Sequence, residues 1–303
     1  MSKSIDRLAL LETFIRIAEA GSISAAARDL GLSQPSVSRQ LAELELRFNV
    51  QLIRRTTHSL SLTQAGAELL ADARRLLDDW EVLEEKHIDL GEALQGKLKI
   101  VAPVALGQLH LVVAALKFQQ THPLVSISWH LEDSDIRFAE VGCDCWIKVG
   151  PIPDHSLLSE PLGQAERIVV ASPQFLTTYG RHETPEDLGE LPCVALDPFE
   201  GRRIPLTNRE DRTVLVSPPV QMNTNNIFAL RQAVLAGLGI AVMPRWLISD
   251  ELEKGTLVDF IPKWRAPKLT IYAASLPERH RPRRLHRFIE RLKAEIHHIP
   301  GIG

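Results

Sequence analysis

The chain has 303 residues and a formal net charge of −3, from 35 basic and 38 acidic side chains. Its 45% hydrophobic and 24% charged residues can bury real cores, which excludes wholesale disorder, collagen-like repeats and a disulfide-stapled miniprotein. No window approaches the ~18 uninterrupted apolar residues of a membrane span, and the first residues lack a signal-peptide core, so we expect about two domains, a cytoplasmic location and no membrane partner.

The charge is divided unevenly along the first third of the chain. Residues 1–65 hold eight basic and six acidic side chains, whereas residues 66–93 hold three basic and nine acidic ones. The change from a weakly basic to a strongly acidic segment predicts a boundary between them.

Three short helices are predicted in the basic segment. An apolar stripe at helical spacing covers residues 8–18, and Ser22 or Ser24 caps a second helix that ends at Gly31. A third helix begins after Ser33. Two short helices joined by a glycine turn predict a helix-turn-helix.

The exposed face of the third helix carries side chains that form hydrogen bonds: Gln34, Ser36, Ser38, Arg39 and Gln40. These residue types suit base edges and phosphates in a major groove. The alternative is a helical bundle with a polar surface. The coincidence of turn glycine, cap and polar face favours the DNA reader.

Residues 51–63 alternate apolar and polar at both ends of a polar tip, which predicts a small hairpin with Arg54 and Arg55 near its base. Such a wing beside a recognition helix can contact flanking phosphates.

The acidic segment has a heptad pattern, with a 4-3 spacing of the seam residues Leu69, Ala73, Leu76, Trp80, Leu83, His87 and Leu90. This spacing is typical of a coiled coil and predicts dimerisation through a helix. A helix that packs within its own chain is the alternative.

From residue 96 onward the pattern changes to alternating strands and helices. Strands are predicted at 97–102, 125–131, 145–149, 167–171, 240–244 and 269–273, and helices at 107–120, 227–236 and 283–296. This alternation predicts an open sheet with helices on both faces and a ligand cleft at the strand ends. The basic run from Arg279 to Arg291 could be a second nucleic-acid patch; we expect a solvated helix face instead, while a contact with another protomer stays open.

The sequence resembles the LysR-type transcriptional regulators over nearly its whole length. The resemblance is carried by residues 24–27, 32–41, 52–57, 61–66, 102–105, 132–135, 144–150, 170–173 and 236–241. It implies an N-terminal all-α winged helix-turn-helix, a long linker helix and an α/β effector domain of two Rossmann-like lobes, similar to periplasmic binding proteins. It also implies a homodimer or homotetramer on an interrupted palindrome of double-stranded DNA, with RNA polymerase as a candidate partner.

We therefore expect a DNA-binding domain over 1–65, a dimerisation helix over 66–93 and an effector-binding domain over 94–303. Lobe I would comprise about 94–162 and 268–303, and lobe II about 163–267. The expected DNA-binding residues are Ser33, Gln34, Pro35, Ser36, Ser38, Arg39, Arg54, Arg55 and Thr56. The expected dimerisation residues are Leu69, Ala73, Leu76, Trp80, Leu83 and Leu90.

The resemblance also implies a small-molecule effector between the lobes and no other cofactor. The expected effector-binding residues are Val104, Ala105, Leu106, Asp133, Ser134, Lys148, Gly150, Ser172, Asn225 and Asn226. Helix N-termini at Ser172 and Asn225–Asn226 favour an anion, and Ala105 with Trp146 favours an apolar or aromatic body. We therefore expect an anionic or aromatic effector.

Other functions fit the sequence less well. The histidines and the three cysteines, Cys143, Cys145 and Cys193, lack metal-ligand spacing, and no nucleophile or phosphate-binding motif is present, so we expect neither an enzyme nor a metal site. A redox-sensing regulator of the same architecture stays an alternative, although buried structural thiols are favoured. A non-catalytic oligomeric interaction protein would explain the heptads but not the recognition helix.

Overall fold

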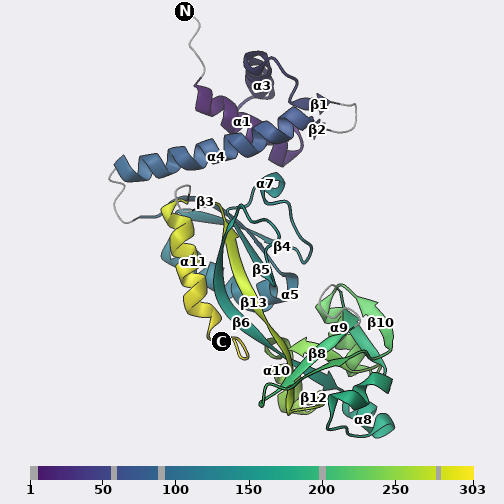
Figure 1. Cartoon of the computed structure of the whole chain (residues 1–303). Coiled ribbons are helices and arrows are strands. Elements are labelled where there is room, and N and C mark those ends of the chain that lie inside the picture. The colour runs from purple at the N-terminus through teal and green to yellow at the C-terminus, as the bar shows by residue number, and fades with distance from the viewer. Residues whose placement is uncertain (1–5, 56–59, 88–92, 198–202, 278–280) are drawn as a thin grey trace, which may run out of the picture. The chain divides into compact units, whose positions relative to one another are not determined.

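The computed structural model describes residues 6–55, 60–87, 93–197, 203–277 and 281–303 (Figure 1). The chain separates into two compact units. The first comprises Met1–Ala93, Ile136–Cys143 and Leu276–Arg283, and the second comprises Leu94–Asp135, Asp144–Ser275 and Arg284–Gly303. None of the described helices has the length and apolarity needed to cross a membrane.

The three predicted helices at the start of the first unit are confirmed. They are α1 (Arg7–Ala20), α2 (Ile23–Asp29) and α3 (Gln34–Phe48). Ser22, and not Ser24, caps α2 by accepting a hydrogen bond from the Ala25 amide. Ser33 caps α3 as predicted, since its hydroxyl accepts from the Ser36 amide at 3.3 Å.

All three helices contribute to one apolar core. Phe14 and Ile17 of α1, Ala26 of α2, and Val37 and Leu41 of α3 are fully buried. Because one face of α3 is buried in this way, its opposite face is left at the surface.

A two-stranded hairpin and a long helix complete this unit, together with one short helix from later in the chain. These elements are β1 (Ile53–Arg55), β2 (Leu60–Leu62), α4 (Gln64–His87) and α7 (Phe138–Val141). The strands β1 and β2 pair antiparallel, as the predicted wing requires.

The second unit is built on one mixed sheet. Its principal strands, in spatial order, are β11 (Ala241–Pro244), β6 (Leu158–Ala171), β13 (Trp264–Ser275), β5 (Cys145–Val149), β3 (Gly96–Ala102) and β4 (Val125–Leu131). The strand β3 runs parallel to β4 and β5, whereas β13 runs antiparallel to both β5 and β6. The remaining strands are β7 (Cys193–Leu196), β8 (Ile204–Asn208), β9 (Thr213–Val216), β10 (Val220–Thr224) and β12 (Val258–Asp259).

Two of these strands are much longer than their sequence patterns predict. The strand β6 has 14 residues and β13 has 12, whereas the apolar runs cover only 167–171 and 269–273. Both expected lobe boundaries, at 162/163 and 267/268, fall inside these strands. Figure 1 shows the pair passing side by side from one lobe of the sheet into the other.

The second unit also contains nine described helical segments. They are α5 (Val104–Leu106), the π-helix η1 (Gly107–Leu111), α6 (Val112–Thr121), α8 (Pro173–Tyr179), η2 (Pro185–Glu190), α9 (Ile227–Leu235), η3 (Arg245–Leu247), α10 (Ser249–Lys254) and α11 (Arg283–Ile296). The helix predicted from residue 107 begins three residues earlier, as the run α5–η1–α6.

The expectation of a solvated basic face on α11 is wrong at Arg284. This residue is buried, and its Nε donates a hydrogen bond to the Lys97 carbonyl oxygen at 2.9 Å. Gly96 makes room for the guanidinium, since a Cβ there would lie 3.3 Å from the Arg284 Cζ. The arginine therefore attaches α11 to the first strand of the sheet.

Candidate functional sites

The exposed end of α3 holds the predicted DNA-reading residues. Ser33, Gln34, Pro35 and Arg39 are exposed, and Ser36 and Ser38 are half-buried. The hydroxyls of Ser33 and Ser36 lie 2.8 Å apart, which keeps both at the first turn of the helix. The surface thus presents one guanidinium, an amide and hydroxyl groups, which can bond to base edges and phosphates.

The expectation that Gln40 belongs to this reading face is wrong. Its Oε1 accepts a hydrogen bond from the hydroxyl of Thr13, a buried residue of α1. Because a buried hydroxyl needs a partner, Gln40 is committed to holding α3 against α1.

The wing is described in part. Arg54 is exposed on β1. Arg55 lies on the same strand, while Thr56 lies outside the described residues.

The predicted heptad seam of α4 divides into two parts. Ala73 is buried and Leu69 packs against the core of its own unit, whereas Leu76, Trp80 and Leu83 are 50%, 44% and 47% exposed. The exposed residues keep a 4-3 spacing and so form an apolar stripe along one side of the helix. Leu90 lies outside the described residues.

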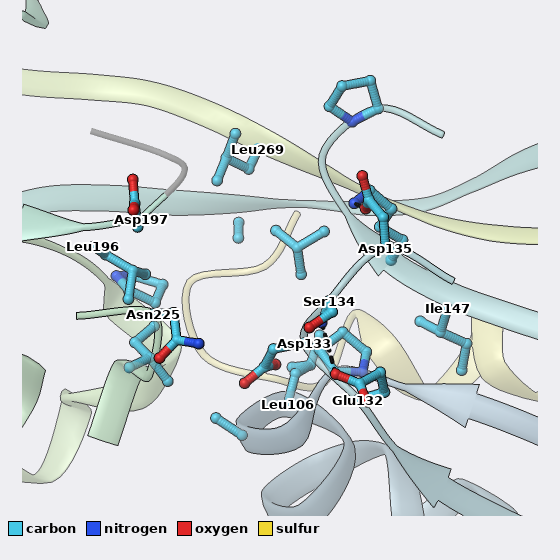
Figure 2. Close-up of a pocket in the computed structure, with 18 of the residues that line it drawn as sticks. Leu106, Glu132, Asp133, Ser134, Asp135, Ile147, Leu196, Asp197, Asn225 and Leu269 are labelled. Atoms are coloured by element: carbon cyan, nitrogen blue, oxygen red, sulfur yellow. Dashed lines mark hydrogen bonds and ion pairs between the residues drawn. The ribbon is translucent and has the colours of Figure 1, made fainter. Parts of the chain in front are cut away.

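A cavity of about 720 Å³ lies within the second unit (Figure 2). Its walls come from the ends of β4, β5, β7 and β11 and from the middle of β6 and β13. Six of the expected effector residues line it: Ala105, Leu106, Asp133, Ser134, Lys148 and Asn225. The remaining four, Val104, Gly150, Ser172 and Asn226, are not among its lining residues.

Helix N-termini around the cavity are capped by the chain itself. Asp133 Oδ1 accepts a hydrogen bond from the Val104 amide at 2.9 Å, at the start of α5. Asn226 Oδ1 accepts from the Phe228 and Ala229 amides at 3.1 Å each, at the start of α9. The Val104, Phe228 and Ala229 amides are therefore occupied and do not serve an anion.

Ser172 has a similar structural role. It is buried, and its hydroxyl accepts a hydrogen bond from the Phe175 amide at the start of α8. An N-cap position is recognisable in sequence, but whether it faces a cavity depends on how the helix packs.

Sequence patterns missed several lining residues. Asp197, Trp246 and Leu269 line the cavity, as does Arg167. Asp197 directly follows β7, a strand that the sequence pattern did not predict. No motif signals such positions, because several strands far apart in sequence place them together.

The carboxyl group of Asp133 has a perturbed affinity for protons. The residue is open to the cavity, while protein atoms surround part of its carboxyl group. This partial burial raises the pKa of Asp133 above its ordinary value; the Val104 amide opposes the shift and the charge of Glu132 adds to it.

The cysteines do not form a site. Cys143, Cys145 and Cys193 are all buried and free of disulfides, and none lines the cavity. Within the described part of the chain, no group of three or more histidine, cysteine, aspartate or glutamate side chains could hold a metal ion.

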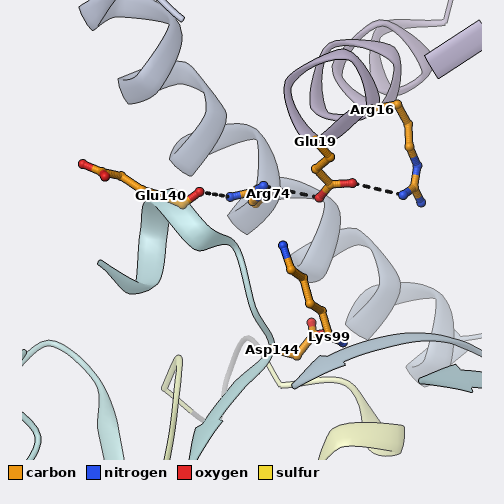
Figure 3. Close-up of polar contacts among 6 residues, drawn as sticks. All are labelled: Arg16, Glu19, Arg74, Lys99, Glu140 and Asp144. Carbon is orange, nitrogen blue, oxygen red and sulfur yellow. Dashed lines mark hydrogen bonds and ion pairs between the residues drawn. The ribbon is translucent and has the colours of Figure 1, made fainter. Parts of the chain in front are cut away.

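Arg74 of α4 connects three parts of the first unit (Figure 3). Its guanidinium forms an ion pair with Glu19 of α1 at 3.3 Å and donates to the Glu140 carbonyl oxygen of α7 at 3.3 Å. Gly142 leaves the necessary space, because a Cβ there would lie 1.9 Å from the Arg74 Cζ. The segment that contains α7 connects Asp135 to Asp144. Asp144 Oδ2 accepts a hydrogen bond from the Lys99 amide at 2.6 Å.

The raised pKa of Asp133 predicts a pH dependence of stability. Between the unfolded and folded pKa values the folded state binds more protons, so the free energy of unfolding falls as the pH rises. Asp133→Asn keeps an oxygen that can accept from the Val104 amide, but its side chain has no carboxyl group to ionise. We expect the variant to gain stability relative to the wild type as the pH rises above about 4, the ordinary pKa of an aspartate carboxyl. Urea denaturation followed by tryptophan fluorescence tests this, and parallel pH profiles would contradict it.

The Arg74 contacts predict that Arg74→Ala loosens α7. Hydrogen bonds to charged groups contribute about 1.5–3 kcal/mol, so the amides of residues 136–143 should exchange with deuterium several-fold faster. Arg75→Ala is the matched control, since the Arg75 side chain is 57% exposed and pairs with Asp72 of its own helix. Equal exchange rates in the two variants would show that Arg74 does not hold α7.

Comparisons with known proteins cover both units. Residues 8–67 match the family model for the bacterial regulatory helix-turn-helix protein of the lysR family, and residues 91–296 match the LysR substrate binding domain. The HTH-type transcriptional regulator PtxR of Pseudomonas aeruginosa is 29% identical, over 99% of this chain and 98% of that protein. An uncharacterized HTH-type transcriptional regulator of Haemophilus influenzae is 30% identical, over 92% of this chain and 96% of that protein.

Solved structures are similar over the same length. The full-length Vibrio cholerae virulence activator AphB has a TM-score of 0.60 at 26% identity, covering 95% of this chain and 99% of its own. A full-length OxyR from Pseudomonas aeruginosa shares the fold, with a TM-score of 0.73 at 18% identity and coverage of 96% and 95%. Together with the two family models, these similarities show that the chain is a DNA-binding transcriptional regulator and belongs to the LysR family.

Proposed function

We propose that the chain is a sequence-specific regulator that pairs through α4 and changes its DNA binding when a small molecule occupies the cavity of the second unit. One observation carries this proposal: the same chain has an exposed polar helix, α3, and a cavity of about 720 Å³. The similar proteins are transcriptional regulators, which supports a non-catalytic function. Its site of action would be the cytoplasm, where bacterial DNA lies.

In this proposal α3 enters the major groove. Gln34, Ser36, Ser38 and Arg39 read base edges, Ser33 and Pro35 set the first turn, and the wing arginines Arg54 and Arg55, with Thr56, contact flanking phosphates. Two protomers would read the halves of an interrupted palindrome, and contact with RNA polymerase would convert binding into transcription.

A small molecule in the cavity would act as the effector. This proposal is supported by six expected effector residues that line the same cavity: Ala105, Leu106, Asp133, Ser134, Lys148 and Asn225. The segment Ile136–Cys143 supports a link to DNA binding: it belongs to the first unit, while Asp135 and Trp146 near its two ends line the cavity. A redox function has weaker support, because all three cysteines are buried.

The recognition-helix proposal predicts the effect of Arg39→Ala. A bidentate contact with a base contributes about 1–3 kcal/mol, so affinity for the operator should fall about 5- to 150-fold. Footprinting and titration on the DNA beside its own gene measure this. Arg181→Ala is the control, because it removes the same charge from an exposed position in the second unit. Unchanged operator affinity for Arg39→Ala at every salt concentration would rule out this contact.

The pairing proposal predicts the effect of Leu76→Glu. A carboxylate in the exposed apolar stripe of Leu76, Trp80 and Leu83 would lose its hydration in the interface without gaining a partner, so the assembly should dissociate toward monomers. Sedimentation equilibrium measures the change. Leu215→Glu is the matched control, since Leu215 is 59% exposed on β9 of the second unit. Identical masses for the two variants would exclude α4 from the interface.

A further inference from the structure

The walls of the cavity also specify the charge of its ligand. This inference rests on the proposed function, since it takes the cavity of the second unit to be the effector site. Acidic side chains line it from two sides: Glu132, Asp133 and Asp135 follow β4, and Asp197 follows β7. Figure 2 shows Asp197 across the open space from the other three.

The basic side chains of the wall are already engaged. Among the described lining residues these are Lys148 and Arg167. Lys148 Nζ is paired with the Asp135 carboxylate and lies 5.2 Å from the centre of the Trp146 ring. Arg167 donates from Nε to the Pro267 carbonyl oxygen at 2.9 Å. An anionic ligand would have to compete with Asp135 for Lys148, and it would approach three further carboxylates.

The backbone offers an anion little compensation. The Val104 amide at the start of α5 already donates to Asp133, and the Phe228 and Ala229 amides of α9 already donate to Asn226. These helix ends are the usual places for a carboxylate or phosphate. Here the chain supplies its own acceptors, one of which is itself a carboxylate.

Between the acidic walls the surface is apolar and partly aromatic. Trp146 and Trp246 are largely buried with one edge at the cavity, and Leu106, Ile227 and Leu269 complete this surface. Such a surface stabilises a hydrocarbon or ring by burial.

We propose that the cavity binds an organic ammonium compound, whose ammonium group is met by Asp133 and whose apolar body lies against the tryptophan and leucine walls, while the Asp197 carboxylate on the opposite wall adds to the negative potential. Asp133 Oδ2 accepts no hydrogen bond from any residue that the structure describes, so it can accept one from an ammonium group. The same step offsets the partial desolvation of that carboxyl. An aromatic body agrees with the expectation from the sequence. The positive charge is the opposite of the negative charge that was expected from the helix N-termini in the sequence.

Three probes with the same phenylpropyl skeleton and different charge test this proposal on the full chain: 3-phenylpropylamine, 3-phenylpropionate and 3-phenylpropanol. A charge-assisted hydrogen bond contributes about 1.5–3 kcal/mol, so calorimetry should give the amine an affinity at least about tenfold above those of the acid and the alcohol. Stronger binding of the acid would overturn the proposal, and so would an amine that does not bind at millimolar concentration.

Two variants locate the charge. Asp133→Asn and Asp197→Asn keep the size and an acceptor oxygen. Asp133→Asn should weaken amine binding about tenfold, Asp197→Asn should weaken it by less because its carboxylate acts from the opposite wall, and both should leave the alcohol unaffected. Glu253→Gln is the matched control, because Glu253 is exposed on α10 and does not line the cavity. Amine affinity that is unchanged in the double variant Asp133→Asn/Asp197→Asn would overturn the assignment.

Operator binding by the same preparations separates the two proposals. If the amine fails but the acid binds and alters operator affinity, the ligand class is wrong while the proposed regulator stands. If the amine binds but never changes operator affinity, the ligand class stands and the effector function fails.

Discussion

The second unit depends on the antiparallel pairing of β6 and β13. Strands of 14 and 12 residues run side by side through both lobes, so a single hydrogen-bonded ladder connects the helices and strands on either side. Ala165 and Arg167 from the middle of β6, with Leu269 of β13, form one wall of the cavity. Loops from the two lobes close the remaining walls. The ladder therefore fixes the distance across which a ligand must bind.

The walls of this cavity are acidic, whereas a site lined by helix N-termini is expected to attract anions. Helix N-termini attract anions, but those of α5 and α9 accept caps from their own chain, and at α5 that cap is the carboxylate of Asp133. The same side chain thus has two effects: it stabilises the helix start, and it turns a positive site into a negative wall. An acidic wall around buried tryptophans favours an organic cation.

Much of the first unit follows from local sequence. Ser22 and Ser33 cap the helices that their positions predict, and Val37 lies under the recognition helix, because capping and helical periodicity act over a few residues. Gln40 shows where this reasoning ends. It lies on the polar side of α3 in any helical projection, yet the Thr13 hydroxyl of α1 takes its side-chain oxygen, which only the packing of two helices decides.

The family, the order of helix, hairpin, long helix and α/β segments, and the position of α3 all follow from the sequence alone. Those features rest on short-range periodicity, caps and turn residues, which any reader of the chain can find. Tertiary structure decided the cavity: Asp197, Trp246 and Leu269 reach it from strands and turns far apart in the chain, and Ser172 is turned away into the core. It also decided that part of the α4 seam packs internally, because Ala73 lies against the core of its own unit while Leu76, Trp80 and Leu83 stay at the surface. Packing between distant segments leaves no pattern in the local sequence. The N-cap residues alone therefore could not predict the charge of the cavity walls.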